Sequence, residues 1–240
     1  MSAEGREARD DRLRRLNAAR IYAITPDGDP AAVRRLVGAW LRGGADAIQL
    51  RQKTMPRGQV LELACALAAD CAAAGVLLMV NDHVDVAVLS GADGVHVGQD
   101  DLSVAAVRLV VGPALVVGAS ASTPAAGREA ELAGADYLGS GPAFPTPLKT
   151  EKQVIGPGGV AAVAAAVRIP VFAIGGIERS RLAELRASGV ERVCGIRALA
   201  HAPDPEAEVR AWRDELIPPS PPCSGPGGPP SPQGGRDLGP

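Results

Sequence analysis

Short apolar runs alternate with longer Ala-rich segments from about residue 20 to residue 217. The runs are rich in Val, Ile and Leu, as in buried strands, and the segments between them are long enough for helices. We expect eight strands, at RIYAIT 20–25, AIQLR 47–51, LLMVN 77–81, GVHVG 94–98, LVVGAS 115–120, YLGSG 137–141, VFAIGG 171–176 and RVCGI 192–196. The clearest helices are expected over 31–43, 57–74, 123–133, 158–167 and 204–216. This alternation predicts parallel strands joined by helical crossovers.

A short motif recurs before every second expected strand. Its copies are GGADAI 43–48, SGADGV 90–95, AGADYL 133–138 and SGVERV 188–193. Each places a Gly where a helix should end, and Gly suits the left-handed position that follows a helix. Recurrence on alternate strands predicts a closed (β/α)8 TIM barrel. An open doubly wound sheet remains the alternative.

Composition changes at both ends of the chain. Residues 1–19 form a charged, Arg-rich extension that either makes a helix or stays loose, and residues 218–240 are rich in Pro and Gly. We expect one catalytic domain over 20–217 between two disordered extensions, neither of which carries chemistry. A Pro-rich ligand for a partner domain is the less favoured interpretation of the tail.

The overall composition excludes several classes of protein. The chain has 240 residues, 46% hydrophobic, with a net charge of -2, which fits a single domain and gives no footprint for nucleic acid or an anionic membrane. No apolar run has the length of a membrane span. Aromatic residues make up 2%, so Ala, Val and Leu are expected to build the core.

We expect a cytoplasmic protein. The first residues lack the apolar core of a secretion signal, and the cysteines have neither zinc-site nor disulfide spacing, so we interpret them as reduced thiols. They are Cys65, Cys71, Cys194 and Cys223. The sequence leaves open whether the chain forms a homo-oligomer.

In a barrel of this kind, side chains at the carboxyl ends of the strands meet over one mouth, where active sites lie. The residues at those ends, in strand order, are Thr25, Gln49, Arg51, Lys53, Asn81, Asp82, His96, Gln99, Asp100, Asp101, Ser120, Ser122, Thr146, Lys149, Gly175, Gly176, Gly195 and Arg197. The mouth thus combines carboxylates and cations.

The acids at Asp82 and around Asp101 follow neighbouring strands. Mg²⁺ prefers such oxygen ligands and commonly takes one or two carboxylates, with water and substrate phosphates supplying the rest. Arg51, Lys53 and Lys149 would hold the same phosphates. A magnesium-bound diphosphate therefore best satisfies these charges.

The last two strands end in glycine, in AIGGI 173–177 and CGIRAL 194–199. Barrels often bind phosphate there through loop N–H groups and the start of a short helix. Glycine permits the close approach that an anion needs. This part of the mouth predicts a separate monophosphate site.

Each feature also has a purely structural interpretation. Asp82 is equally suited to cap a helix starting near Val84, and Asp100 or Asp101 to cap one after Leu102. Arg51, Lys53 and Arg197 alone would be interpreted as surface cations, and Gly175-Gly176 as a tight turn. His96 is interpreted as a packed histidine more readily than as a base.

Five segments occur in this order along the chain: QLRQK 49–53, NDHVDVA 81–87, GADGVHVGQDD 91–101, GADYLGSGPAFPTPLKT 134–150 and AIGGI 173–177. Together they resemble the signature segments of the thiamine-phosphate synthase (thiamine-phosphate pyrophosphorylase) family. The resemblance implies a TIM barrel and a Mg²⁺-dependent transferase. Its reaction joins 4-amino-5-hydroxymethyl-2-methylpyrimidine diphosphate to a thiazole phosphate, giving thiamine monophosphate and diphosphate.

The resemblance also implies site residues. It makes Asp82 and Asp101 the metal ligands and Arg51, Lys53, Lys149 and Ser120 the catalytic groups. The pyrimidine diphosphate would contact Gln49, Leu50, Arg51, Gln52, Lys53, Asn81, Ser120 and Lys149. The thiazole phosphate would contact Thr146, Pro147, Leu148, Gly176, Ile196 and Arg197.

Three positions depart from the family pattern. Leu148 stands where the family has a Thr, Ser122 where it has a His, and Arg197 where it often has a small hydroxyl residue. Arg197 either replaces a lost phosphate contact or marks weaker binding of the thiazole phosphate. Two alternative functions remain: a thiazole-phosphate tautomerase of the same barrel family, and a non-catalytic sensor of a phosphate ligand.

Overall fold

The computed structural model of the protein describes residues 3–146 and 153–216. Eight parallel strands pair in chain order and close into a barrel, with β1 bonded to β8. The strands are β1 Ile21–Ile24, β2 Ala47–Leu50, β3 Leu77–Asn81, β4 Gly94–Val97, β5 Val116–Ser120, β6 Tyr137–Ser140, β7 Val171–Ala173 and β8 Val193–Gly195. The predicted (β/α)8 barrel is therefore confirmed, with each strand inside its expected range.

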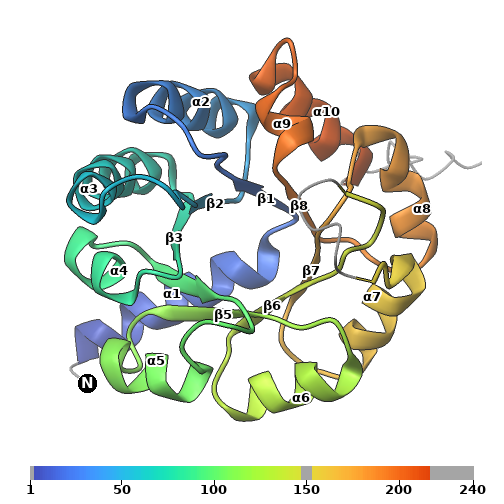
Figure 1. The fold of residues 1–240 in the computed structure, drawn as a ribbon, viewed down its shortest axis with the longest axis horizontal. Helices are drawn as coiled ribbons and strands as arrows, with labels where there is room; N and C mark the ends of the chain where they lie inside the picture. Colours follow the sequence, from blue (N-terminus) through green and yellow to red (C-terminus); the bar gives the residue numbers. More distant parts are fainter. Residues whose placement is uncertain (1–2, 147–152, 217–240) are drawn as a thin grey trace, which may run out of the picture.

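Helices surround the strands (Figure 1). They are α1 Ala3–Ala18, α2 Pro30–Gly43, α3 Arg57–Ala74, α4 Val84–Ser90, α5 Val104–Val111, α6 Pro124–Leu132, α7 Gly156–Ala165, the 3₁₀ turn η1 Arg179–Arg181, α8 Leu182–Ala187, α9 Arg197–Ala200 and α10 Pro205–Leu216. The five helices expected from the sequence agree with these bounds to within two residues. Among the described helices, none combines the length and apolar character needed to cross a membrane.

The barrel interior is built around three rings. Tyr22, Tyr137 and Phe172 contact one another edge to face, with ring centroids 5.5–5.9 Å apart. The expectation of a core built from Ala, Val and Leu holds between the barrel and its helices. Inside the barrel, Ala47, Leu77 and Val116 are joined by the three rings, which were not expected. Gly118 makes room for these rings, because a Cβ there would lie 2.1 Å from the Tyr137 ring.

The acids of the repeated motif join neighbouring strands. Asp46 Oδ2 accepts the N–H groups of Arg20 and Ile21 at the start of β1, at 2.8 and 2.9 Å. Asp93 Oδ2 accepts from Leu78 N–H at 3.0 Å, and Asp136 Oδ2 accepts from Val117 N–H at 2.8 Å. The motif therefore satisfies backbone donors at the amino-terminal end of the barrel, where stability rather than chemistry is expected.

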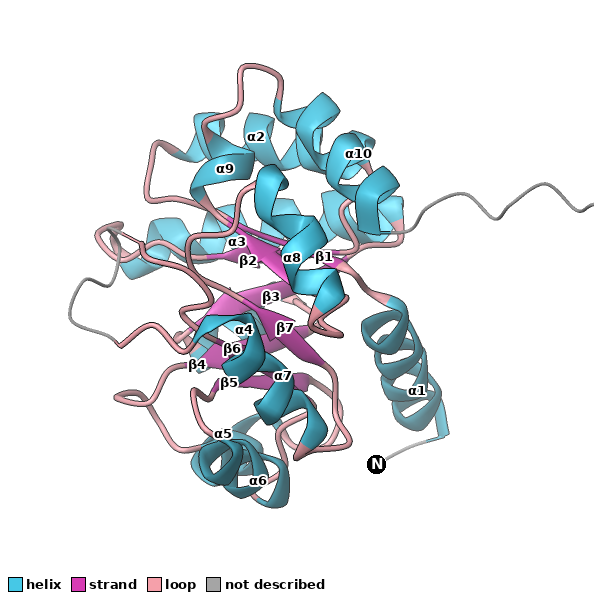
Figure 2. Cartoon of the chain, turned by 90° about the vertical axis from the view of Figure 1, so that its right-hand side faces the viewer, coloured by secondary structure: helices cyan, strands magenta, loops and turns pink. Residues whose placement is uncertain are grey.

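The N-terminal helix packs against this same end of the barrel. Arg9 donates to Asp136 Oδ1 at 2.7 Å, and Arg12 donates to Asp93 Oδ1 at 2.9 Å. Leu16 lies on the same helical face and is 1% exposed, in contact with the inward-facing side chains. Figure 2 shows α1 outside the ring of helices, across one end of the barrel.

This helix differs from the expected disordered N-terminal extension. Its arginines pair with acids that lie far away in the sequence, which composition alone does not reveal. The predicted tail, residues 218–240, lies outside the described residues.

We expect Asp93→Ala to lower the free energy of unfolding by about 2–4 kcal/mol. The substitution removes the acceptor of the Leu78 N–H and the carboxylate that pairs with Arg12 and Arg15. Urea denaturation measures this loss. Asp85→Ala is the control, since the Asp85–Arg57 pair is exposed and should be worth less than about 1 kcal/mol. Equal losses in the two variants would contradict the stabilising role of the motif.

Candidate active site

The loop after β2 is fixed to the loop after β1. Thr25 Oγ1 accepts from Arg51 N–H at 2.9 Å, and Asp27 accepts from Lys53 N–H. Gln52 donates to Pro26 O at 2.8 Å and accepts from Gly28 N–H at 3.0 Å. These bonds fix the backbone of Arg51 and Lys53 in the loop that follows β2.

Asp82 directly follows β3 and has a left-handed backbone conformation, with φ of 61°. Its N–H donates to His96 O at 2.8 Å, and its carboxylate lies 2.5 Å from Lys53 Nζ. The residue before α4 is His83, without a side-chain cap, so Asp82 does not serve as the helix cap. A non-glycine residue held in this conformation stores strain, and such residues concentrate at functional sites.

Asp101 lies in the loop after the neighbouring strand β4, where its Oδ2 accepts from Gly98 N–H at 2.9 Å. Helix α5 is capped by Ser103, whose hydroxyl accepts from Ala106 N–H. The prediction that Asp100 or Asp101 caps this helix is therefore wrong. Asp82 and Asp101 both follow strands that pair side by side, β3 and β4.

The carboxylates of Asp82 and Asp101 fit Mg²⁺ if water and phosphate oxygens supply its remaining ligands. Among the described residues, no group of three or more His, Cys, Asp or Glu side chains could hold a metal. Two carboxylates suffice for Mg²⁺ when water and phosphate oxygens complete its shell. An ion there would displace the Lys53 ammonium, which neutralises Asp82 in its place.

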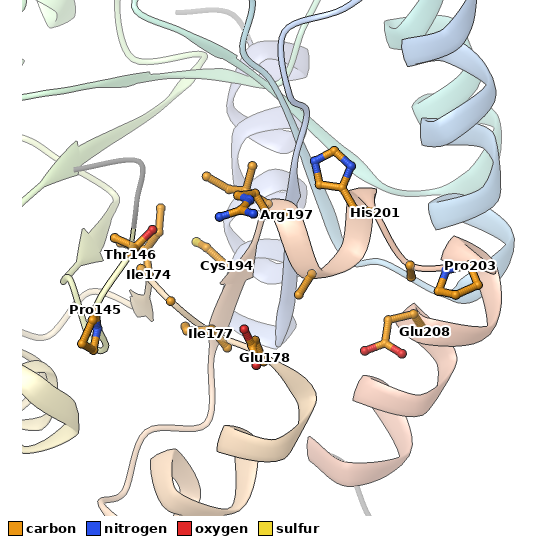
Figure 3. A pocket seen from close by; sticks show the side chains of 15 residues that line it. Pro145, Thr146, Ile174, Ile177, Glu178, Cys194, Arg197, His201, Pro203 and Glu208 are labelled. Carbon is orange, nitrogen blue, oxygen red and sulfur yellow. The ribbon is translucent and has the colours of Figure 1, made fainter. Parts of the chain in front are cut away.

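A cavity of about 430 Å³ opens at the other side of the mouth, beyond β7 and β8. Its lining includes Thr146, Gly176, Ile196 and Arg197, four of the residues that the family resemblance assigns to phosphate binding. Figure 3 shows Arg197, the first residue of α9, directed to the side of the cavity where Thr146 lies. The arrangement suits a singly phosphorylated ligand held by a guanidinium and loop backbone.

The backbone conformation and the close packing at position 176 both require a glycine. Its φ is 63°, and a Cβ would lie 2.5 Å from Pro145 O in the loop after β6. The loops after β6 and β7 therefore meet at this glycine and form one wall of the cavity.

Several cavity residues were not predicted from the sequence. They are Glu178, Cys194, His201 and Glu208. Burial raises the pKa of the Cys194 thiol, so it stays protonated. Glu208 accepts from Trp212 Nε1–H at 2.8 Å. His201 and Glu208 lie after the last sequence motif, CGIRAL 194–199, so no motif pointed to them.

Other predicted residues have different surroundings. The Leu50 side chain is 1% exposed in the core outside the barrel, so it does not face the mouth. Gln52 uses both ends of its amide on the β1 loop, which gives it a supporting role. Ser120 lies 3.0 Å from His96 Nε2 inside the barrel. Pro147, Leu148 and Lys149 lie outside the described residues.

Comparison with known proteins decides the family. A family model described as thiamine monophosphate synthase matches residues 21–199. The chain belongs to this family.

Similar proteins agree with this assignment. A thiamine-phosphate synthase of Chlorobium luteolum is 45% identical over 192 residues, which cover 80% of this chain and 90% of the relative. A thiamine phosphate pyrophosphorylase structure from Pyrococcus furiosus is 34% identical, with a TM-score of 0.75, covering 85% of this chain and 96% of that one.

Some relatives are longer than this chain. A thiamine biosynthesis bifunctional protein of Symbiobacterium thermophilum is 43% identical over 82% of this chain, and a thiamine-phosphate synthase of Gloeobacter violaceus is 41% identical over 82%. The matched region covers only 40% and 57% of their respective lengths.

The departures from the family pattern have different surroundings. Arg197 lines the cavity, while Ser122 precedes Thr123, the cap of α6. Leu148 is among the residues outside the description. Of the two departures that the structure describes, Arg197 is the one that lines the cavity.

We expect Gly176→Ala to destabilise the protein by about 1–3 kcal/mol, because the left-handed backbone and the contact with Pro145 exclude a side chain. Thermal unfolding measures the loss. Gly158→Ala is the control, since a Cβ there meets nothing within 4 Å in helix α7, where Ala favours the helix. A Gly176 variant as stable as the control would refute the close packing of these loops.

Proposed function

We propose that this protein is a thiamine-phosphate synthase that uses Mg²⁺. It would join 4-amino-5-hydroxymethyl-2-methylpyrimidine diphosphate to 4-methyl-5-(2-phosphoethyl)thiazole or its carboxylated form. The main support is one observation: a carboxylate–cation cluster and a separate Arg-lined cavity share one barrel mouth. Two anionic substrates with different phosphate groups match these two halves.

The reaction suits groups that stabilise charge. The bond between the pyrimidine methylene carbon and the diphosphate oxygen breaks, and the electron pair leaves with diphosphate. The thiazole nitrogen then donates its lone pair to the methylene carbon. Cations that hold the leaving oxygens contribute most to such a step, and no general base is required.

The first half of the mouth would bind the diphosphate. Arg51 and Lys53 are presented there by a loop fixed at Thr25 and Asp27, which suits positioned cations. Asp82 and Asp101 would hold Mg²⁺, which when bound neutralises charge on the departing diphosphate. Lys53, now paired with Asp82, would then be free to contact a phosphate oxygen.

Further contacts are proposed for both substrates. Gln49, Asn81, Ser120 and Lys149 would complete the pyrimidine diphosphate site. Thr146, Pro147, Leu148, Gly176, Ile196 and Arg197 would bind the thiazole phosphate, with Arg197 supplying a charged contact in place of a hydroxyl.

We further propose small-molecule partners and a cytoplasmic setting. The catalytic domain would span 20–217, with α1 packed on its amino-terminal end. The tautomerase alternative needs no metal–diphosphate cluster, and the sensor alternative has support only from Leu148. The family assignment and the paired charges favour the synthase over both.

A coupling assay tests this function. The purified protein is mixed with both substrates, with and without Mg²⁺, and thiamine monophosphate is measured. We expect product only when Mg²⁺ is present. Product formed equally well after the metal is chelated, or none beside a competent synthase, would contradict the proposal.

Asp101→Asn should raise the Mg²⁺ concentration needed for half-maximal activity by about tenfold or more, because it removes one charged ligand. The amide oxygen can still accept from Gly98 N–H, so thermal unfolding should change little. Asp100→Asn, at the exposed neighbouring residue, is the matched control and should leave the metal requirement unchanged. An equal metal requirement in both variants would remove Asp101 from the ligand set.

A further inference from the structure

Five polar side chains form a continuous hydrogen-bonded chain across the barrel. Gln49 Nε2 lies 2.8 Å from Tyr22 Oη, which lies 2.8 Å from Tyr137 Oη. Tyr137 Oη lies 3.1 Å from His96 Nδ1, and His96 Nε2 lies 3.0 Å from Ser120 Oγ. The five residues come from β2, β1, β6, β4 and β5, so barrel closure alone brings them together.

The three central residues of this hydrogen-bonded series are buried from solvent. Tyr22 is 2% exposed, Tyr137 is fully buried and His96 is 9% exposed. Burial raises the pKa of both phenols well above the usual value, so both stay neutral. Each buried hydroxyl therefore has one hydrogen to donate and needs an acceptor for it.

The amide at one end sets the direction of every bond. Gln49 Nε2 can only donate, so Tyr22 Oη accepts and must use its own hydrogen on Tyr137. Tyr137 then has His96 Nδ1 as its acceptor. A histidine that accepts at Nδ1 carries its hydrogen at Nε2, which faces Ser120.

We propose that His96 is a positioning residue that turns Ser120 into a hydrogen-bond donor. The relay of Gln49, Tyr22, Tyr137, His96 and Ser120 fixes His96 as the neutral Nε2–H tautomer. Ser120 Oγ accepts from that N–H and keeps its own hydrogen for an acceptor at the mouth. The identity of that acceptor rests on the proposed function: it is a phosphate oxygen of the pyrimidine diphosphate.

The opposite direction would work against binding. A histidine protonated at Nδ1 would take the Ser120 hydrogen at Nε2 and leave oxygen lone pairs facing the mouth. Lone pairs repel an anionic ligand, whereas a donated hydrogen attracts it. The relay therefore couples a residue deep in the barrel, Tyr22, to the polarity of a side chain at the rim.

Nitrogen NMR of the ¹⁵N-histidine-labelled protein tests the tautomer without any substrate. The chain has three histidines, so His83→Gln and His201→Gln variants assign the His96 signals by elimination. We expect His96 to be protonated at Nε2 and unprotonated at Nδ1. Protonation at Nδ1, at both nitrogens, or an even mixture of tautomers would overturn the proposal.

Tyr137→Phe tests the link between the relay and binding. It keeps the ring contacts and removes the hydroxyl, so the His96 signals should lose the single-tautomer pattern. The KM for pyrimidine diphosphate should rise roughly tenfold, the effect of one hydrogen bond to a charged group. Ser140→Ala, on the same strand, is the matched control, because its buried hydroxyl has no partner among the described groups.

A double variant separates a relay from independent effects. If Tyr137 acts through Ser120, then Tyr137→Phe should add little to the KM of Ser120→Ala. Additive losses would overturn the relay. A protein that makes no thiamine phosphate at all would refute the proposed function, while the tautomer measured by NMR would still decide the relay.

Discussion

Closure of eight parallel strands into one ring is the constraint on which the rest of the structure depends. Pairing of β1 with β8 leaves no free edge and brings the carboxyl end of every strand to the same mouth. The register then sets which side chains meet: Asn81 pairs with His96, and Ser120 with Gly139. At the opposite end, the acids of the repeated motif and the arginines of α1 hold the ring together.

Charge balance at the mouth follows from this geometry. Asp82 and Asp101 follow adjacent strands, so this part of the mouth collects negative charge that a cation can neutralise. In the structure Lys53 neutralises Asp82, and Asp101 is held by the Gly98 N–H. Under the proposed function, Mg²⁺ would be held by Asp82 and Asp101, and Lys53 would then be available to contact a phosphate oxygen. The proposed function thus predicts that Lys53 changes its partner when the metal-bound diphosphate binds.

The fold and the outline of this site could be predicted from the sequence, because strand periodicity and the acids after strands are local signals. The three rings inside the barrel could not, since 2% aromatic residues say nothing of where they gather. The prediction that Asp100 or Asp101 caps α5 was wrong, because Ser103 directly precedes this helix and caps it. His96 was expected to be packed, and its partners Tyr137 and Ser120, on other strands, are long-range contacts that no local pattern encodes.

The most direct test of this account measures how Mg²⁺ and inorganic diphosphate bind together. Calorimetric titration of diphosphate into the protein, with and without Mg²⁺, reports their coupling. If the ion bridges the carboxylates to the phosphates, saturating Mg²⁺ should tighten diphosphate binding at least about tenfold, and diphosphate should tighten Mg²⁺ binding by the same factor. Diphosphate binding that is equally strong in a chelator, with no mutual effect, would contradict the account.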